Sequence, residues 1–206
     1  MAGANLTTHL PILQVLNKAN TTPYTSAQPE KAGQTFQFGS PVQLNAGYVQ
    51  EWDGATVAAG ILGVAESFGL NLSSNGLGAP TPPFGQITGA QVIQTYGSVP
   101  NQPLGVNIAL ATPMSDGRTL YMEPNSDNVF QALFDNSAGA VAADWTPVQT
   151  DIGVNYGLTK DANSFWYVDK GKTGAAAVLQ VVGLPDGSYL NAPVTFLFLA
   201  AAVQVI

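Results

Sequence analysis

The chain of 206 residues has little charge, one histidine and no cysteine. Only 9% of its residues are Asp, Glu, Lys or Arg, whereas an ordinary soluble domain carries roughly 25%. Side chains that move protons, hold metals or attack electrophiles are therefore scarce, and the lack of cysteine excludes disulfides and thiolate metal sites. We expect no catalytic residues, no metal, no cofactor and no enzymatic activity, because this inventory suits packing and binding better than chemistry.

Clustered positive charge is also missing. The net charge is −7, and the basic residues are scattered singly along the chain. They are Lys18, Lys31, Arg118, Lys160, Lys170 and Lys172. Nucleic-acid binding requires clustered cations that neutralise phosphates, so we expect no nucleic-acid partner.

No segment has the length of a membrane span. The apolar run at 194–206 holds about 13 residues, fewer than the ~20 that a membrane helix needs. The first residues lack the basic region of a signal peptide. We expect a soluble protein, made in the cytoplasm, with no membrane partner.

Apolar residues and turn formers are plentiful. A hydrophobic content of 46%, with 22 Gly and 14 Pro, favours strands and turns over long helices. The sequence predicts an all-β fold, a β-sandwich or barrel-like arrangement with few or no helices. Expected strands lie at 35–38, 42–44, 48–52, 55–57, 61–65, 91–96, 105–110, 119–122, 129–134, 165–169, 177–183 and within 194–206. Asp53 and Gly54 are expected to form a hairpin turn between 48–52 and 55–57.

The chain divides into an arm and two β-rich parts. Residues 1–33 are predicted to be an extended N-terminal arm, followed by a first half at 34–124 and a second half at 125–206. The two halves could share one domain. A weak echo between 58–64 and 176–184 suggests duplication, although alternating β sequence produces such echoes by chance.

The arm carries one small apolar cluster: Leu10, Ile12, Leu13, Val15 and Leu16. Burying these side chains would contribute on the order of 8–15 kcal/mol, while ordering about 30 residues costs roughly 1–2 kcal/mol each. We therefore expect the arm to be mobile in the free protein and ordered only against a core or a partner.

Two segments are candidates for contact with a partner or another subunit. The first is the apolar arm, through Leu10, Ile12, Leu13 and Leu16. The second is the Gly/Pro-rich loop at 72–86, which is longer than loops that only connect two elements of a compact domain usually are. Its candidate contact residues are Pro80, Pro82, Pro83 and Phe84.

Catalytic alternatives have weak support. His9 lies alone in the arm, where a catalytic triad or zinc site would need partners. A glycan-binding or glycan-cleaving module remains an alternative, because acids near strand ends lie close in sequence to aromatic residues. These residues are Glu51, Glu66, Glu123 and Asp169, with Trp52, Trp166 and Tyr167.

Two strand motifs resemble the head decoration proteins of tailed bacteriophages. The run at 39–44, Gly-Ser-Pro-Val-Gln-Leu, and the run at 60–66, Gly-Ile-Leu-Gly-Val-Ala-Glu, are similar to the opening strands of that family. The later order of strands over 125–206 is similar to phage virion proteins.

This resemblance implies a β-rich, non-enzymatic cement protein. Such proteins bind the major capsid protein on the outer surface of the virion, often as homotrimers, and an N-terminal arm commonly reaches onto the shell. Another virion component (a jelly-roll coat, a head fibre base or a tail protein) is the alternative within structural proteins. Removal of residues 1–20 is expected to abolish attachment and to leave the β core folded.

Overall fold

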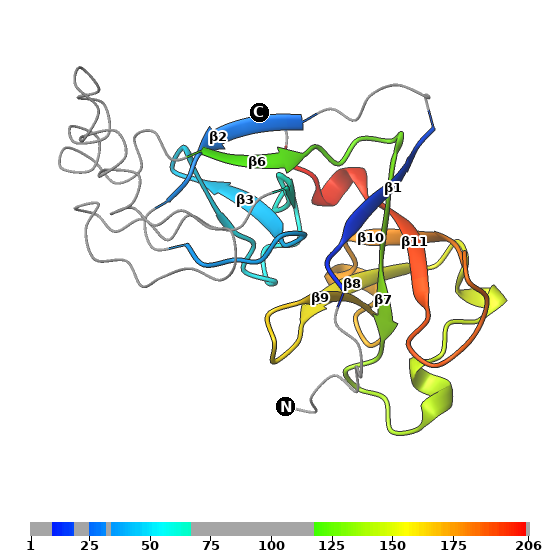
Figure 1. Cartoon of the computed structure of the whole chain (residues 1–206). Coiled ribbons are helices and arrows are strands. Elements are labelled where there is room, and N and C mark those ends of the chain that lie inside the picture. Colours follow the sequence, from blue (N-terminus) through cyan, green and yellow to red (C-terminus); the bar gives the residue numbers. More distant parts are fainter. Residues whose placement is uncertain (1–9, 19–24, 32–33, 67–117, 205–206) are drawn as a thin grey trace, which may run out of the picture.

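The fold is all-β, as the composition predicted (Figure 1). The computed structural model describes residues 10–18, 25–31, 34–66 and 118–204. The strands are β1 (Leu13–Asn17), β2 (Thr25–Pro29), β3 (Pro41–Asn45), β4 (Tyr48–Glu51), β5 (Gly63–Ala65), β6 (Arg118–Met122), β7 (Asn128–Asp135), β8 (Asn155–Lys160), β9 (Trp166–Asp169), β10 (Leu179–Gly183) and β11 (Pro193–Phe198). Short 3₁₀ helices lie at η1 (Ala142–Trp145), η2 (Gln149–Asp151), η3 (Gly174–Ala176) and η4 (Ala200–Ala202).

Five strands of the second half close into a barrel. Their order is β7-β11-β10-β8-β9, and β9 then pairs with β7 again. The closing pair is parallel, with Phe134 opposite Val168 and Asp135 opposite Asp169, while the other neighbours are antiparallel. Closure removes the exposed edges that an open sheet of this size would carry. The barrel-like arrangement expected from the sequence is confirmed.

β2, from the expected arm, and the described strands of the first half form a sheet with the same topology. Its order is β2-β6-β5-β3-β4, and a parallel bridge between Glu30 and Val49 joins the end of β2 to β4. The strands of each set can be counted along the chain, from β2 in this sheet and from β7 in the barrel. In both sets the first strand then lies beside the fifth, the fifth beside the fourth, the fourth beside the second and the second beside the third. The sequence echo at 58–64 and 176–184 overlaps the fourth strand of each set, β5 and β10. The shared topology is what an internal duplication would produce.

The turn chemistry of the first half differs from the sequence expectation. Ala46 and Gly47 both have positive φ, 52° and 87°, and they join β3 to β4 in a two-residue turn of the kind that suits hairpins. The predicted hairpin at Asp53 is wrong. The Asp53 carboxylate instead accepts hydrogen bonds from the backbone N–H groups of Ala55 and Thr56. It folds the chain locally without a returning strand, and these bonds lower the pKa of Asp53.

The described part of the expected arm belongs to the sheets. β1 pairs with the first part of β7, from Leu13 opposite Gln131 to Asn17 opposite Asn128, and β2 pairs with β6. A Cβ at Gly39 would lie 2.5 Å from the Pro11 Cβ, so only glycine fits there. Within residues 10–18, the extended arm expected from the sequence is instead a sheet strand that packs on the core of the same chain.

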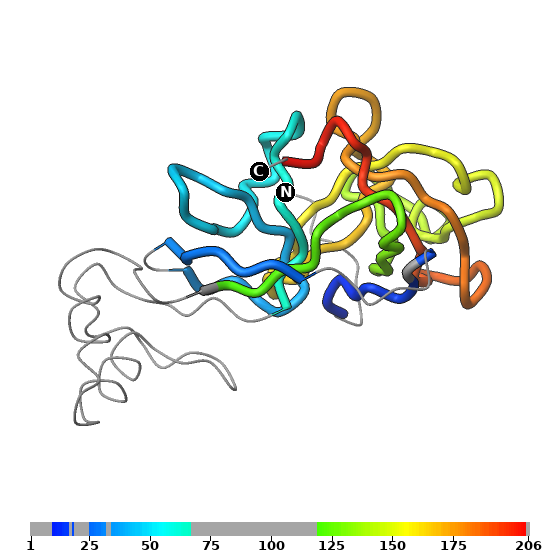
Figure 2. The backbone as a smooth tube through the Cα atoms, turned by 90° about the horizontal axis from the view of Figure 1, so that it is seen from above, coloured from blue at the N-terminus to red at the C-terminus, as the bar shows by residue number. Residues whose placement is uncertain are grey.

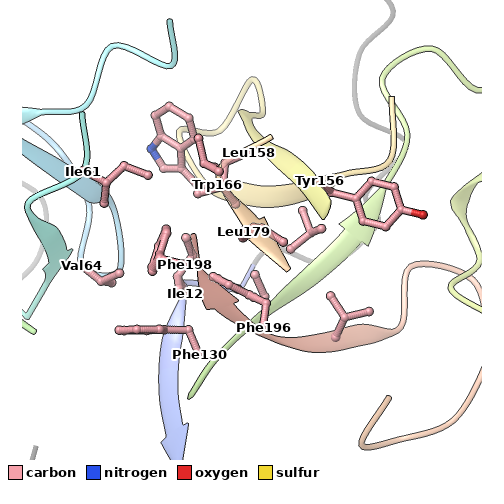
Figure 3. Packing of buried hydrophobic residues seen from close by; sticks show 14 of the residues in the cluster. Ile12, Ile61, Val64, Phe130, Tyr156, Leu158, Trp166, Leu179, Phe196 and Phe198 are labelled. Atoms are coloured by element: carbon pink, nitrogen blue, oxygen red, sulfur yellow. The ribbon is translucent and has the colours of Figure 1, made fainter. Parts of the chain in front are cut away.

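A single apolar cluster fills the barrel and continues into the first half. Phe130, Phe196 and Phe198 pack against one another inside the barrel, with ring centroids 5.2 to 6.0 Å apart. Ile61 and Val64 reach this cluster from the first half (Figure 3). A second cluster, which includes Phe36 and Tyr121, forms the core of the sheet β2-β6-β5-β3-β4.

The two halves lie side by side (Figure 2), and the segment after β11 connects them through hydrogen bonds. The Ile61 N–H donates to the Ala202 carbonyl at 2.9 Å, and the Gln204 N–H donates to the Ile61 carbonyl at 2.7 Å. The Gln204 side chain bonds both the N–H and the carbonyl of Leu44. Backbone ladders and a shared core therefore fix the relative position of the halves.

Replacement of Ile12 by alanine should destabilise the protein. Ile12 is 1% exposed within the barrel cluster, so the change leaves a cavity that costs about 2–4 kcal/mol. Leu16→Ala is the matched control, since Leu16 is 56% exposed, and it should change stability by less than ~0.5 kcal/mol. Urea unfolding measures both variants. Equal stability of the two would show that β1 does not complete the core.

Candidate functional site

The acids singled out from the sequence support the fold. Asp169 is fully buried and accepts hydrogen bonds from the Ser137 and Thr159 hydroxyls and from the backbone N–H groups of Ser137 and Gly171. Glu123 accepts a hydrogen bond from Ser26. These acceptor roles satisfy donors within the sheets, and within the described ranges no three His, Cys, Asp or Glu side chains gather as a metal would require.

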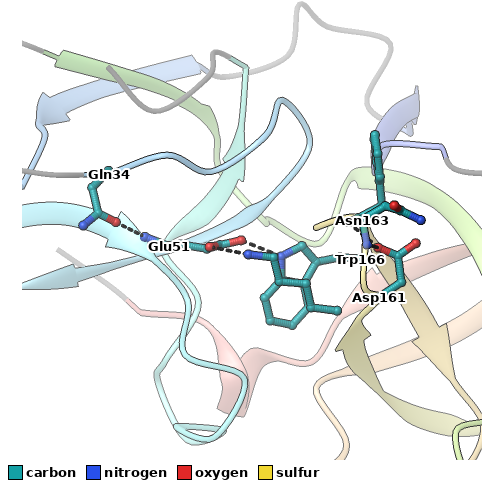
Figure 4. Close-up of polar contacts among 7 residues, drawn as sticks. Gln34, Glu51, Asp161, Asn163 and Trp166 are labelled. Carbon is teal, nitrogen blue, oxygen red and sulfur yellow. Dashed lines mark hydrogen bonds and ion pairs between the residues drawn. The ribbon is translucent and has the colours of Figure 1, made fainter. Parts of the chain in front are cut away.

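Glu51 joins the two halves through two donors. Its carboxylate accepts from the Trp166 indole N–H at 2.9 Å and forms a 2.8 Å ion pair with Lys160 (Figure 4). The Glu51 and Lys160 side chains are 21% and 33% exposed, so this contact is partly screened by solvent. The Gln34 side chain accepts from the Glu51 backbone N–H. Glu51 is thereby a positioning group at the junction of the halves.

The aromatic residues considered for glycan stacking are buried. Trp52 and Trp166 are 3% and 5% exposed, and their rings lie 5.3 Å apart. Tyr167 is also buried, and burial together with Asp169 and Asp135 raises the pKa of its phenol. A sugar needs an open ring face for stacking, so these residues belong to the core and the glycan alternative loses its main support.

An exposed apolar surface lies instead on β1 and on the loop before β11. Its members are large hydrophobic side chains with between 38% and 56% of their surface exposed. They are Leu10, Leu13, Val15, Leu16, Tyr189 and Leu190. We call this surface the β1 face. It has no charged side chain among its members, which is unusual for an edge strand, because edges are normally protected by charge.

A groove connects the two parts of the β1 face. It has a volume of about 230 Å³ and is lined by Leu10, Gln131, Leu133, Asp186, Tyr189, Leu190, Asn191 and Pro193. Leu10 comes from the segment before β1, and Tyr189 and Leu190 come from the loop between β10 and β11. We call it the β1 groove. It brings Leu10 together with Tyr189 and Leu190, which are distant from it in sequence.

The contact residues predicted from the sequence have three outcomes. Leu10, Leu13 and Leu16 lie on the β1 face. Ile12 is a correction: it alternates to the opposite side of the segment and is buried in the core, so it is not available to a partner. Pro80, Pro82, Pro83 and Phe84, the 72–86 loop and His9 lie outside the described residues.

Sequence reasoning missed Tyr189 and Leu190. They follow a turn at Pro185, Asp186 and Gly187, in which Gly187 has φ 89°. Two large apolar residues directly after such a turn, outside any strand, were the available signal.

Comparison with known proteins adds no relative. Neither a scan against protein-family models nor a search of curated proteins finds a match to this chain. Over the ranges that the structure covers, no helix has the length and apolarity to cross a membrane.

The junction at Glu51 predicts an energetic coupling between the halves. In a double-mutant cycle of Glu51→Ala with Trp166→Phe, we expect a coupling of about 1 kcal/mol, because each change removes the same hydrogen bond. Urea unfolding measures each variant. Lys31→Ala is the control partner for Trp166→Phe, since Lys31 makes only an exposed contact with Gln50, and this pair should be additive. Additivity of the Glu51 pair as well would contradict the junction.

Proposed function

We propose that this protein is a capsid decoration protein, which binds the major capsid protein on the outer surface of a phage shell and stabilises the shell without catalysis. The observation that carries the proposal is the β1 face, a set of large apolar side chains exposed on β1, in the segment before it and in the loop before β11. Large apolar patches of this kind mark sites of protein association.

The chemistry of the β1 face suits a protein partner. Interface cores are depleted in charge and enriched in aromatic and large apolar residues, and Leu13, Leu16 and Tyr189 have that character. Few ions need to be desolvated when such a surface is covered, which avoids a cost of several kcal/mol per unpaired charge. A fixed surface also loses less conformational entropy on binding than a mobile arm would.

The motifs that resemble decoration proteins form one structural unit. Pro41 lies opposite Val64 and Val42 opposite Gly63, so β3 and β5 are antiparallel neighbours. Added Cβ atoms at Gly63 would lie 2.5 Å from the Met122 carbonyl oxygen, which explains the glycine in the second motif. This pairing supports the resemblance because both motifs serve one local packing arrangement.

A homotrimer would strengthen attachment. Once one subunit has bound the shell, each further contact is effectively intramolecular, at millimolar effective concentration for short connections. Modest affinity at each β1 face is then sufficient for stable decoration. The protein would be made in the host cytoplasm and then attach to the outer surface of the virion. Its net charge of −7 favours solubility and disfavours contact with DNA.

Paired substitution on the β1 face tests the proposal. Leu13→Ser with Leu16→Ser should reduce co-sedimentation with purified phage heads at least tenfold, since each truncation removes apolar contact worth about 1–2 kcal/mol. The thermal unfolding midpoint should stay close to that of the parent, because Leu13 and Leu16 are 38% and 56% exposed and lie outside the core clusters.

Leu120→Ser is the matched control. Leu120 is 47% exposed but lies on β6, in the other sheet, so its replacement should leave sedimentation unchanged. Deletion of residues 1–20 is a poor test, because it also removes the buried Ile12 and the β1 ladder. Normal sedimentation of the double variant, or no sedimentation of the parent protein, would overturn the proposal.

A further inference from the structure

The β1 groove has the dimensions of a side-chain site. Its volume of about 230 Å³ falls below the roughly 300–1,000 Å³ of sites for small-molecule ligands and cofactors. The groove opens on the β1 face, where a partner polypeptide would lie. One extended side chain of that partner is the occupant that its size favours.

Two acceptors of the groove, the Asp186 carboxylate and the Asn191 Oδ1, lack a described partner. Asp186 lies on an exposed turn, and no described cation forms an ion pair with it. Asn191 is 7% exposed; its Nδ2 donates to the Phe134 carbonyl at 3.0 Å, while its Oδ1 accepts no hydrogen bond from any described residue. A buried carbonyl without a donor is costly. The charge of Asp186 favours an occupant with a positive charge.

The walls of the groove suit a long aliphatic stem. Leu10, Leu133 and Pro193 supply apolar surface, and Tyr189 supplies an exposed aromatic ring. Lysine and arginine bury their methylene groups against such surface and keep the charged end near water. An aromatic face nearby further favours a cation.

We propose that the β1 groove binds a lysine or arginine side chain of the partner polypeptide, with the stem against Leu10 and Leu133 and the cationic end beside Asp186. This inference rests on the proposed function for the identity of the partner as the shell protein. A second copy of this chain is a poorer source, because its 13 acidic residues outnumber its six basic ones.

Titration of the isotope-labelled full chain tests the groove without any shell. The probes are N-acetyl-lysine-N-methylamide, its arginine counterpart and its norleucine counterpart, which has an aliphatic stem but no charge. We expect the lysine and arginine probes to shift the NMR signals of the Asn191 side-chain amide and of Leu190, and the norleucine probe to leave them in place. Equal shifts with norleucine, or no shifts with any probe, would overturn the inference.

Asp186→Asn removes the charge with little change of shape. It should weaken binding of the lysine probe about two- to fivefold, the range for an exposed ion pair, and added salt should weaken the parent to a similar extent. Glu66→Gln is the matched control, since it changes the net charge equally at the end of β5. Equal effects of both variants would contradict a specific role of Asp186.

Co-sedimentation with heads separates this inference from the proposed function. If the parent binds heads and Asp186→Asn binds them equally well, the groove inference fails and decoration stands. If the parent does not bind heads while the lysine probe still occupies the groove, the shell assignment fails and the groove inference stands.

Discussion

The fold depends on how one edge of β7 is shared between two partners. The end of that edge pairs in parallel with β9 at Phe134 and Asp135 and thereby closes the barrel. Its beginning, from Asn128 to Gln131, pairs with β1. Because β9 occupies only part of the edge, the remaining backbone groups need a further strand, and a segment from the start of the chain supplies it. Closure of the barrel and placement of β1 are thus consequences of the same shared edge.

The position of β1 accounts for the surface on which the function rests. Ile12 is buried and completes the core, while Leu13 and Leu16 are 38% and 56% exposed. The segment is held by the ladder to β7 and by close packing at Gly39, so its outward side chains are not needed for folding. An apolar surface that contributes nothing to the core is explained more simply by a partner than by stability.

Each of the two strand sets has a buried acidic residue at the same place in its topology. Where the first strand meets the third in parallel, Glu30 in one half and Asp135 in the other are fully buried. The Thr119 hydroxyl donates to Glu30 at 2.8 Å. Buried carboxylates therefore stand at equivalent junctions of the two strand sets. The shared strand order and these acids favour duplication of an ancestral barrel strand set.

Alternation and turn residues predicted the strands that have strong apolar faces. β3, β4, β5, β6, β7, β9, β10 and β11 overlap the expected ranges, whereas the barrel strand β8 was not expected. β2 was missed because Thr25–Pro29 has no apolar face; its pairing with β6 holds it in place. β1 was assigned to a mobile arm because its burial was weighed against the ordering of some 30 residues. Only a short segment needs to be ordered, and the β7 ladder stabilises it through contacts that no local pattern reveals.

The remaining errors have the same physical origin. The strand expected at 35–38 is irregular, although Phe36 is buried in the first sheet's core, because a buried aromatic residue fits a loop as well as a strand. Asp53 was assigned to a hairpin from its neighbour Gly54, yet side-chain hydrogen bonds to the backbone formed a local turn instead. On the candidate site, the sequence identified Leu10, Leu13 and Leu16 but not Tyr189, since tertiary packing alone brings that loop beside β1.

A cryo-EM map of phage heads incubated with the protein tests the central claim most directly. We expect added density at equivalent positions over the outside of the shell, with β1 and the Tyr189 loop turned toward the capsid surface. Heads without added density, or density in which the β1 face is turned to solvent, would contradict a decoration role through this surface.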